Sequence, residues 1–167
     1  MIDCILIIII AIILIFLSWI SFSFFGAPFQ PSSDRELREM IELASFKKRQ
    51  KTADLGSGDG KVVIEFAKRG AEAHGFEINP LLVWIAKKKI KRLGLKNAFI
   101  HKKNFWKQDF SGFDIVTSFQ ISYVMPGLEE KLKKELKKGA KVISNTWTFP
   151  NWKPKKQEGK VYLYERE

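Results

Sequence analysis

The stretch that decides the fold is Thr52-Ala53-Asp54-Leu55-Gly56-Ser57-Gly58-Asp59-Gly60, where a short strand is expected to run into a glycine-rich turn. Residues 61–69 follow with apolar side chains at helical spacing, and residues 71–76 predict a second strand. Glycines in such a turn permit positive φ and let the backbone approach a ligand closely. The turn therefore predicts a ligand site at the carboxyl end of a parallel strand, where open α/β sheets bind small molecules.

The alternation of strands and helices continues on both sides of this turn. Ser33 and Glu36 form a capping box that opens a helix upstream, and Asn79 with Pro80 is typical of the start of another. A further helix is expected from Pro126 to Gly139, and further strands at 98–101, 114–119, 140–146 and 160–164. The last two strands should pair antiparallel at the edge, because no helix of ordinary length separates them. The pattern predicts an α/β fold with a mostly parallel sheet and helices on both faces.

An acidic residue at the end of the second strand narrows the choice of ligand. Glu77 lies 21 residues after Gly56, where a carboxylate can accept hydrogen bonds from the two hydroxyls of a ribose. A dinucleotide turn reads G-x-G-x-x-G, whereas this one reads G-x-G-x-G with Asp54 and Asp59 at its ends. These carboxylates would repel a diphosphate and attract an ammonium and a sulfonium. We therefore predict S-adenosylmethionine as the ligand; an empty turn in a non-catalytic domain is the alternative.

Polar and aromatic residues after the third strand are candidates for the adenine contact. The Asn104 amide could bond the edge of the base while Phe105 covers its face. Loop capping by Asn104 and core packing by Phe105 are the alternatives.

Three polar residues follow the fourth strand, where the acceptor group would lie: Gln120, Ser122 and Tyr123. They are the candidate catalytic residues, because they could orient an amine beside the methyl donor. An Asp-Pro-Pro-Tyr-like tetrad, which enzymes acting on planar amide or base nitrogens use, is absent after this strand. Aromatic side chains could wall a channel for a lysine stem or simply pack in the core, namely Trp147, Phe149 and Trp152.

These motifs resemble those of the class I, seven-strand S-adenosylmethionine-dependent methyltransferases. More narrowly, the chain is similar to the small membrane-anchored protein-lysine methyltransferases that act on the ATP synthase c-subunit or on the adenine nucleotide translocase. The stretches that carry this resemblance are 26–32, Asn79-Pro80-Leu81-Leu82-Val83-Trp84, 125–132 and Thr148-Phe149-Pro150-Asn151-Trp152. The chain departs from the eukaryotic members at Ser122, where they carry a proline.

The resemblance implies a Rossmann-like class I fold and a lysine ε-amine as the acceptor. It implies contacts with S-adenosylmethionine at Asp54, Gly56, Gly58, Glu77 and Asn104, which the residues alone also indicate. The full set of predicted cofactor-binding residues is Asp54, Gly56, Ser57, Gly58, Asp59, Gly60, Glu77, Ile78, Asn104 and Phe105.

The N-terminus is an uncharged apolar run from Ile5 to Phe25, long enough as a helix to cross a hydrocarbon core. No basic residue precedes it, so an anchor is favoured over a cleaved signal peptide. The expected organisation is a transmembrane anchor over 1–25, a linker over 26–31 and a methyltransferase domain over 32–167. Because every basic residue follows the run, we expect a single-pass protein with its domain on the cytoplasmic side.

Composition sets the remaining limits. After residue 30 the chain holds all 29 Lys and Arg and 17 of the 18 Asp and Glu, a formal net charge of +12. The single cysteine, Cys4, excludes a disulfide scaffold, and two histidines argue against a multi-histidine metal site, so no metal is predicted. The expected partner is a membrane-associated protein substrate. The lysine runs at 87–89 and 153–156 keep a nucleic-acid methyltransferase open, and a non-catalytic membrane-tethered domain is a second alternative.

Overall fold

The computed structural model describes residues 6–15 and 32–167, which belong to two compact units divided between residues 30 and 31. In the first unit, residues 6–15 are helical and exposed. The anchor predicted over 1–25 lies largely outside the described residues, and the linker predicted over 26–31 lies wholly outside them. Within residues 6–15 and 32–167, no helix combines the length and the apolar character needed to cross a membrane.

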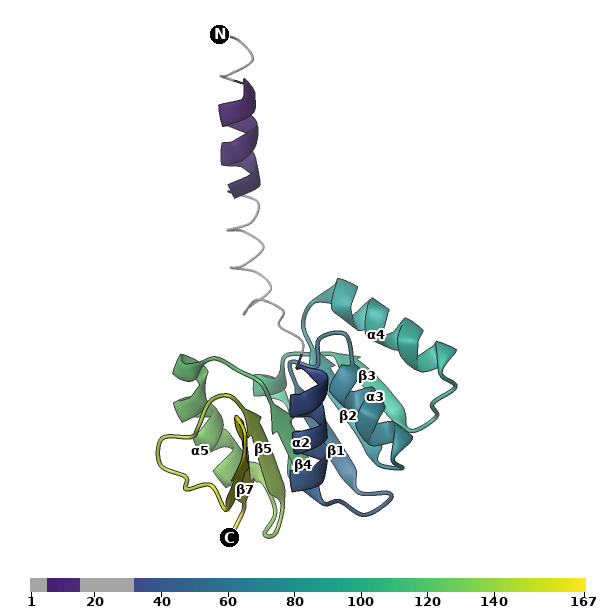
Figure 1. Cartoon of the computed structure of the whole chain (residues 1–167), viewed down its shortest axis with the longest axis vertical. Coiled ribbons are helices and arrows are strands. Elements are labelled where there is room, and N and C mark those ends of the chain that lie inside the picture. Colours follow the sequence, from purple (N-terminus) through teal and green to yellow (C-terminus); the bar gives the residue numbers. More distant parts are fainter. Residues whose placement is uncertain (1–5, 16–31) are drawn as a thin grey trace. The chain divides into compact units, whose positions relative to one another are not determined.

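The second unit is built on a seven-stranded sheet (Figure 1). In spatial order its strands are β3 (Ala98–Lys102), β2 (Glu72–Glu77), β1 (Lys51–Leu55), β4 (Ile115–Ser118), β5 (Lys141–Asn145), β7 (Val161–Glu165) and β6 (Lys156–Glu158). The first five run parallel, and β7 pairs antiparallel with β5 and with β6. The predicted parallel sheet and the antiparallel β5–β7 pair are confirmed.

The prediction that β7 forms the edge is wrong, because β6 lies outside it. The sequence Lys156-Gln157-Glu158 has no apolar side chain, and all three residues are exposed. A strand with no buried face leaves no alternation of apolar and polar residues for sequence reasoning to detect.

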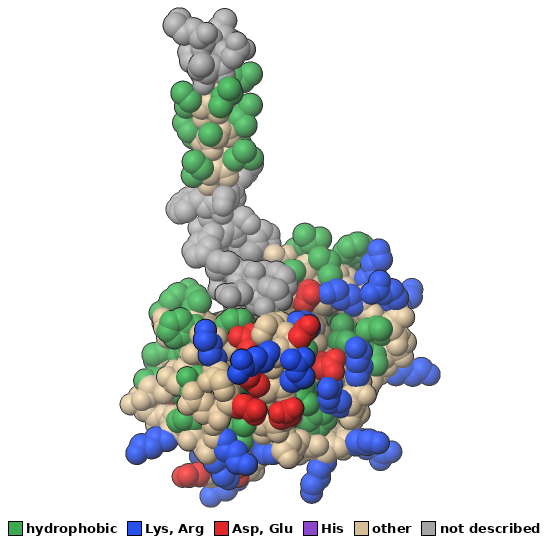
Figure 2. Space-filling model, viewed as in Figure 1, with side chains coloured by type: hydrophobic (Ala, Val, Ile, Leu, Met, Phe, Trp, Pro, Cys, Tyr) green, Lys and Arg blue, Asp and Glu red, His purple; other side chains and the backbone are tan. Residues whose placement is uncertain are grey.

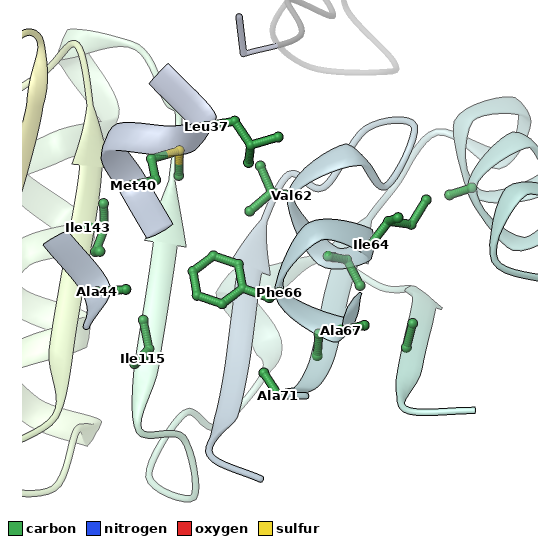
Figure 3. Close-up of a cluster of buried hydrophobic side chains, with 14 of the residues drawn as sticks. Leu37, Met40, Ala44, Val62, Ile64, Phe66, Ala67, Ala71, Ile115 and Ile143 are labelled. Carbon is green, nitrogen blue, oxygen red and sulfur yellow. The ribbon is translucent and has the colours of Figure 1, made fainter. Parts of the chain in front are cut away.

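Helices cover both faces of the sheet, as predicted. They are α2 (Asp34–Ala44), α3 (Lys61–Lys68), α4 (Pro80–Arg92) and α5 (Met125–Glu135), with 3-10 turns η1 (Phe105–Lys107) and η2 (Ser122–Val124). On one face, side chains of α2 and α3 meet those of β4 and β5, with Phe66, Ile115 and Ile143 at the contact (Figure 3). The second cluster, on which α5 packs, includes Leu128 and Leu132.

Local signals fix where the helices begin. The α2 capping box is formed in both directions: Ser33 Oγ accepts from Glu36 N at 3.2 Å, and Glu36 Oε2 accepts from Ser33 N at 2.8 Å. Asn79 Oδ1 accepts from Leu81 N at 3.0 Å at the start of α4. These contacts satisfy amide groups that have no partner inside the first turn of a helix.

The prediction that the last helix reaches Gly139 is wrong. It ends at Glu135, and Leu136 takes an extended conformation with ψ 139° while staying buried. The chain then turns toward β5, with Gly139 N donating to Arg166 O at 2.7 Å. Leu136 therefore keeps its helical spacing and its burial although it lies outside the helix. Hydrophobic periodicity alone does not show where α5 ends.

Candidate active site

The glycine-rich turn lies at the carboxyl end of β1, between β1 and α3. Gly56, Gly58 and Gly60 have φ of 75°, 53° and 80°, in the left-handed region that glycine tolerates. A Cβ on Gly56 would lie 2.8 Å from Gln120 Nε2, and one on Gly60 would lie 2.9 Å from Ala86 Cβ. Conformation and packing therefore both require glycine at Gly56 and Gly60.

Four amides of the turn donate to oxygens of the protein itself. Gly56 N and Ser57 N donate to Phe76 O at 2.9 and 3.1 Å, and Gly60 N donates to Ser57 O at 2.9 Å. Gly58 N donates to Glu77 Oε2 at 2.8 Å. A phosphate-binding loop needs such amides for its anion. Their use within the protein disfavours a diphosphate, in agreement with the prediction drawn from the acidic flanks.

Glu77 is buried at the end of β2 and rigidly held. Its carboxylate accepts from the backbone nitrogens of Gly58, Ile78 and Asn79, each at 2.8 Å. A carboxylate offers about four acceptor positions. The Glu77 carboxylate can therefore accept a hydrogen bond from one ribose hydroxyl directly. It can accept one from a second hydroxyl only if one of the three amides shares or gives up its acceptor position.

The two aspartates of the turn have different surroundings. Asp54 is buried, and its Oδ1 accepts from Thr117 Oγ1 at 2.7 Å. Burial raises the pKa of Asp54 to about 7, the Thr117 hydrogen bond opposes this rise, and the charges of Glu77 and Asp59 add to it. Asp59 instead forms an ion pair with Lys89 of α4. Asp54 thus has no cationic partner among the residues that the structure describes.

Two buried serine hydroxyls border this site. Ser57 Oγ and Ser118 Oγ have no hydrogen-bond partner among residues 32–167. The Ser57 side chain lies under the turn, since a Cβ on Gly75 of β2 would be 2.5 Å from its Oγ. A buried carboxyl without a cationic partner, beside hydroxyls without hydrogen-bond partners, fits a ligand that carries an ammonium and a ribose. S-adenosylmethionine is such a ligand.

The residues after β3 make local contacts. Asn104 Oδ1 caps η1 by accepting from Trp106 N at 2.9 Å, and Phe105 packs partly against the second core cluster. These are the contacts expected from the alternatives of capping and packing. Both residues lie beyond the carboxyl end of β3 and remain candidates for the adenine contact, as Ile78 does beyond β2.

The three candidate catalytic residues follow β4. Gln120 Nε2 donates to Leu55 O at 2.8 Å, which ties the end of β4 to the glycine turn. Ser122 and Tyr123 lie in η2, and Tyr123 is 76% exposed. The fold therefore brings Gln120 to the turn and leaves the other two side chains open to a partner molecule.

The predicted aromatic channel is only partly compatible with the structure. Phe149 is buried, with its ring centroid 5.6 Å from that of Trp152 and 4.8 Å from that of Tyr164. Phe149 therefore belongs to the core and the partly buried Trp152 packs against it, in line with the packing alternative that the sequence left open. Trp147 is 41% exposed and can still line an entrance.

Sequence reasoning missed Thr117 and Lys89, which set the environment of the two aspartates. Thr117 is opposite Asp54 in the parallel register of β1 and β4. The signal available was a hydroxyl in an otherwise apolar strand, but its partner depends on strand order. The sequence places Lys89 only in the lysine run at 87–89, and the packing of α4 is what brings it to Asp59.

Similar proteins were found by sequence. The chain is 37% identical to the ATP synthase c-subunit lysine N-methyltransferase of Rattus norvegicus over 143 residues, which cover 83% of this chain and 66% of that protein. It is 35% identical to a protein-lysine N-methyltransferase of Saccharolobus islandicus, covering 82% and 92%. The chain spans 54–66% of the length of the rat, mouse and human c-subunit enzymes that it matches.

Similarity of structure and a family match complete the comparison. An RNA methyltransferase from Salinibacter ruber, solved with S-adenosyl-L-homocysteine, has a TM-score of 0.78 and 29% identity, covering 81% of this chain and 93% of that one. Residues 54–156, from the glycine turn to the start of β6, match the ANTKMT methyltransferase domain. The chain therefore belongs to the family defined by the ANTKMT methyltransferase domain.

Proposed function

We propose that the protein is an S-adenosylmethionine-dependent methyltransferase that acts on the ε-amine of a lysine in a membrane-associated protein. The observation that carries the proposal is the pairing of the glycine turn with buried Glu77 and Asp54, in a chain related to protein-lysine methyltransferases. The relatives include enzymes named for the ATP synthase c-subunit and for the adenine nucleotide translocase.

The cofactor would be held by the residues around the turn. When bound, S-adenosylmethionine supplies a methyl group activated by its sulfonium. Glu77 would accept from the ribose, and ionised Asp54 would face the ammonium of the methionine part. Asn104 and Phe105 would approach the adenine, beyond the end of β3. Gly56 and Gly58 would let the backbone come close to the ligand.

The acceptor amine must be neutral to react. Because the pKa of lysine is near 10.4, deprotonation at pH 7 costs roughly 4.6 kcal/mol. A nearby cation and an apolar entrance both lower that pKa. Gln120, Ser122 and Tyr123 would then need only to orient the amine, because no strong base is required.

The membrane location is part of the proposal. The uncharged run at 5–25 is the proposed anchor, and the positive charge that follows it supports a cytoplasmic domain. Residues 26–31 would be the linker. Such an arrangement confines the active site to the neighbourhood of the bilayer, where a membrane-associated substrate presents its lysine.

The proposal is tested by methyl transfer from labelled S-adenosylmethionine into membranes that lack the protein. The full chain should label one or a few proteins, and mass spectrometry should find methyl-lysine in them. Glu77→Ala should remove the labelling because the ribose contact is lost. Glu72→Ala, at the other end of β2, should retain it. Labelling that is equal for both variants, or absent with the unaltered chain, would contradict the proposal.

An RNA methyltransferase is the second candidate. The similarity to the Salinibacter ruber enzyme and the net charge of +12 after residue 30 favour it. The same assay with total RNA separates the two candidates, because label in RNA and none in protein would replace the lysine proposal.

A further inference from the structure

Exposed apolar side chains of residues 32–167 gather at one edge of the sheet. Eight large hydrophobic residues in this part of the chain are exposed. Six of them follow the carboxyl ends of parallel strands and are here called the aromatic rim: Ile78, Leu81, Trp84, Trp106, Tyr123 and Trp147. The other two lie elsewhere, Leu93 at the far end of α4 and Phe99 within β3. The rim therefore surrounds the proposed active site rather than being scattered over the surface.

The segments that carry the rim hold lysines and no acidic residue, while the exposed Asp109 and Glu130 lie just beyond them in the sequence. The segments that carry it are 78–88, 102–108, 119–128 and 146–148, and they contain no Asp or Glu. They contain five lysines, at 87, 88, 102, 103 and 107. Lys88 Nζ lies 4.9 Å from the centroid of the Trp84 ring. Figure 2 shows hydrophobic side chains over α4 with Lys and Arg side chains at their border.

The chain also enters the domain at this edge. Ser32, the first described residue of the unit, accepts from Lys61 Nζ at 2.7 Å through its carbonyl oxygen. Its hydroxyl lies 3.5 Å from Asn145 Nδ2. Lys61 opens α3 after the glycine turn and Asn145 ends β5. In the sequence, six residues, 26–31, separate the apolar run at 5–25 from Ser32.

We propose that the aromatic rim docks on the surface of an anionic lipid bilayer, as a contact separate from the N-terminal run. Trp and Tyr are enriched at the interface between lipid and water because one end of each ring is polar. Lysines add attraction to anionic headgroups, and carboxylates would oppose it. A protein partner that fitted this rim would have to offer acidic groups around an apolar patch; a bilayer supplies both over its whole surface. Docking would place the entrance of the proposed active site at the membrane surface.

Tryptophan fluorescence of the full chain tests the proposal. The protein has five tryptophans, Trp19, Trp84, Trp106, Trp147 and Trp152. One variant keeps only Trp84 and another keeps only Trp152, with the others changed to Phe. In phosphatidylglycerol vesicles that contain brominated lipid, we expect Trp84 to be quenched at least about twice as strongly as Trp152. Trp152 is the internal control because its ring packs against Phe149 and Tyr164. Equal quenching would overturn the proposal.

A matched pair of substitutions on α4 tests the apolar contact. In the Trp84-only chain, Leu81→Ser should reduce quenching by about half, because Leu81 is 62% exposed in the rim. Leu93→Ser should leave quenching unchanged, since Leu93 lies about 18 Å further along the helix. Both variants should keep their affinity for S-adenosylhomocysteine, which shows that they fold. An effect of equal size from both would overturn the assignment.

Two further outcomes separate the alternatives. Quenching as strong in phosphatidylcholine as in phosphatidylglycerol vesicles would overturn the anionic assignment. If Leu81→Ser leaves quenching unchanged but slows methylation of a detergent-solubilised substrate, the rim docks on protein and the bilayer proposal is wrong. The docking proposal does not depend on methyl transfer. If the chain binds no S-adenosylhomocysteine, the proposed function is wrong. The quenching of Trp84 still shows whether the rim docks on the bilayer.

Discussion

Asp54 lies where ionisation of a carboxyl is unfavourable, because it is buried beside two other carboxylates. Its pKa is raised from 3.8 to about 7. Between these values the native chain keeps a proton that the unfolded chain loses. Asp54 should therefore make the free energy of unfolding fall as the pH rises through this window. Asp54→Asn should remove that contribution and be more stable than the unaltered chain at pH 8, by roughly 1–4 kcal/mol.

Chemical denaturation at pH 5 and pH 8 measures this difference. In the unaltered chain, calorimetric affinity for S-adenosylmethionine should rise as the pH increases through about 7, because the ionised form favours the ammonium. An affinity that falls over the same range would show that Asp54 does not face the cation.

Gly75 is required by the close approach of Ser57. A Cβ at this position would lie 2.5 Å from Ser57 Oγ and 2.8 Å from Ile100 Cδ1. Gly75→Ala should lower the free energy of unfolding by about 1–3 kcal/mol. Adding Ser57→Gly should recover part of the loss, with a coupling of about 0.5–3 kcal/mol in a double-mutant cycle. Gly112→Ala is the control, because no atom lies within 4 Å of its Cβ position. Additive effects would contradict the contact.

At the scale of elements, α5 is tied to the segment before β6 by one buried carboxylate. Glu129 Oε2 accepts from Asn151 N at 2.8 Å, and its Oε1 pairs with Lys133 at 2.6 Å. Glu129→Leu should cost about 1–3 kcal/mol in thermal or chemical unfolding, because the partly buried Asn151 amide loses its hydrogen-bond partner. Glu130→Leu, at an exposed neighbouring position, should change stability by less than about 0.5 kcal/mol. Equal losses would show that the tie contributes nothing.

For the whole molecule, the described core lies within the second unit. Both buried clusters consist of residues from Leu37 onward. A chain that begins at Pro31 should therefore melt within about 3 °C of the full chain. It should also bind S-adenosylhomocysteine within about twofold of the full chain, as measured by calorimetry. Aggregation, or loss of binding with the fold intact, would show that residues 1–30 contribute to the domain.

Most elements could be predicted because their signals are local. The capping box at Ser33 and the Asn79-Pro80 start of α4 act within one helical turn, and both are formed as expected. The β6 strand could not be predicted, because an exposed edge strand has no apolar periodicity. The end of α5 was misplaced because a buried Leu136 satisfies the periodicity outside the helix.

The sequence by itself determined the alternation of strand and helix, the glycine turn and the acidic residue at the end of β2. These depend on conformational preferences of neighbouring residues, which the tertiary environment rarely overrides in long periodic segments. Only the tertiary structure decided that Asp54 has no cationic partner and a raised pKa, that Lys89 pairs with Asp59, and that Phe149 packs in the core. Burial and charge pairing join segments far apart in the chain, so strand order and helix packing set them.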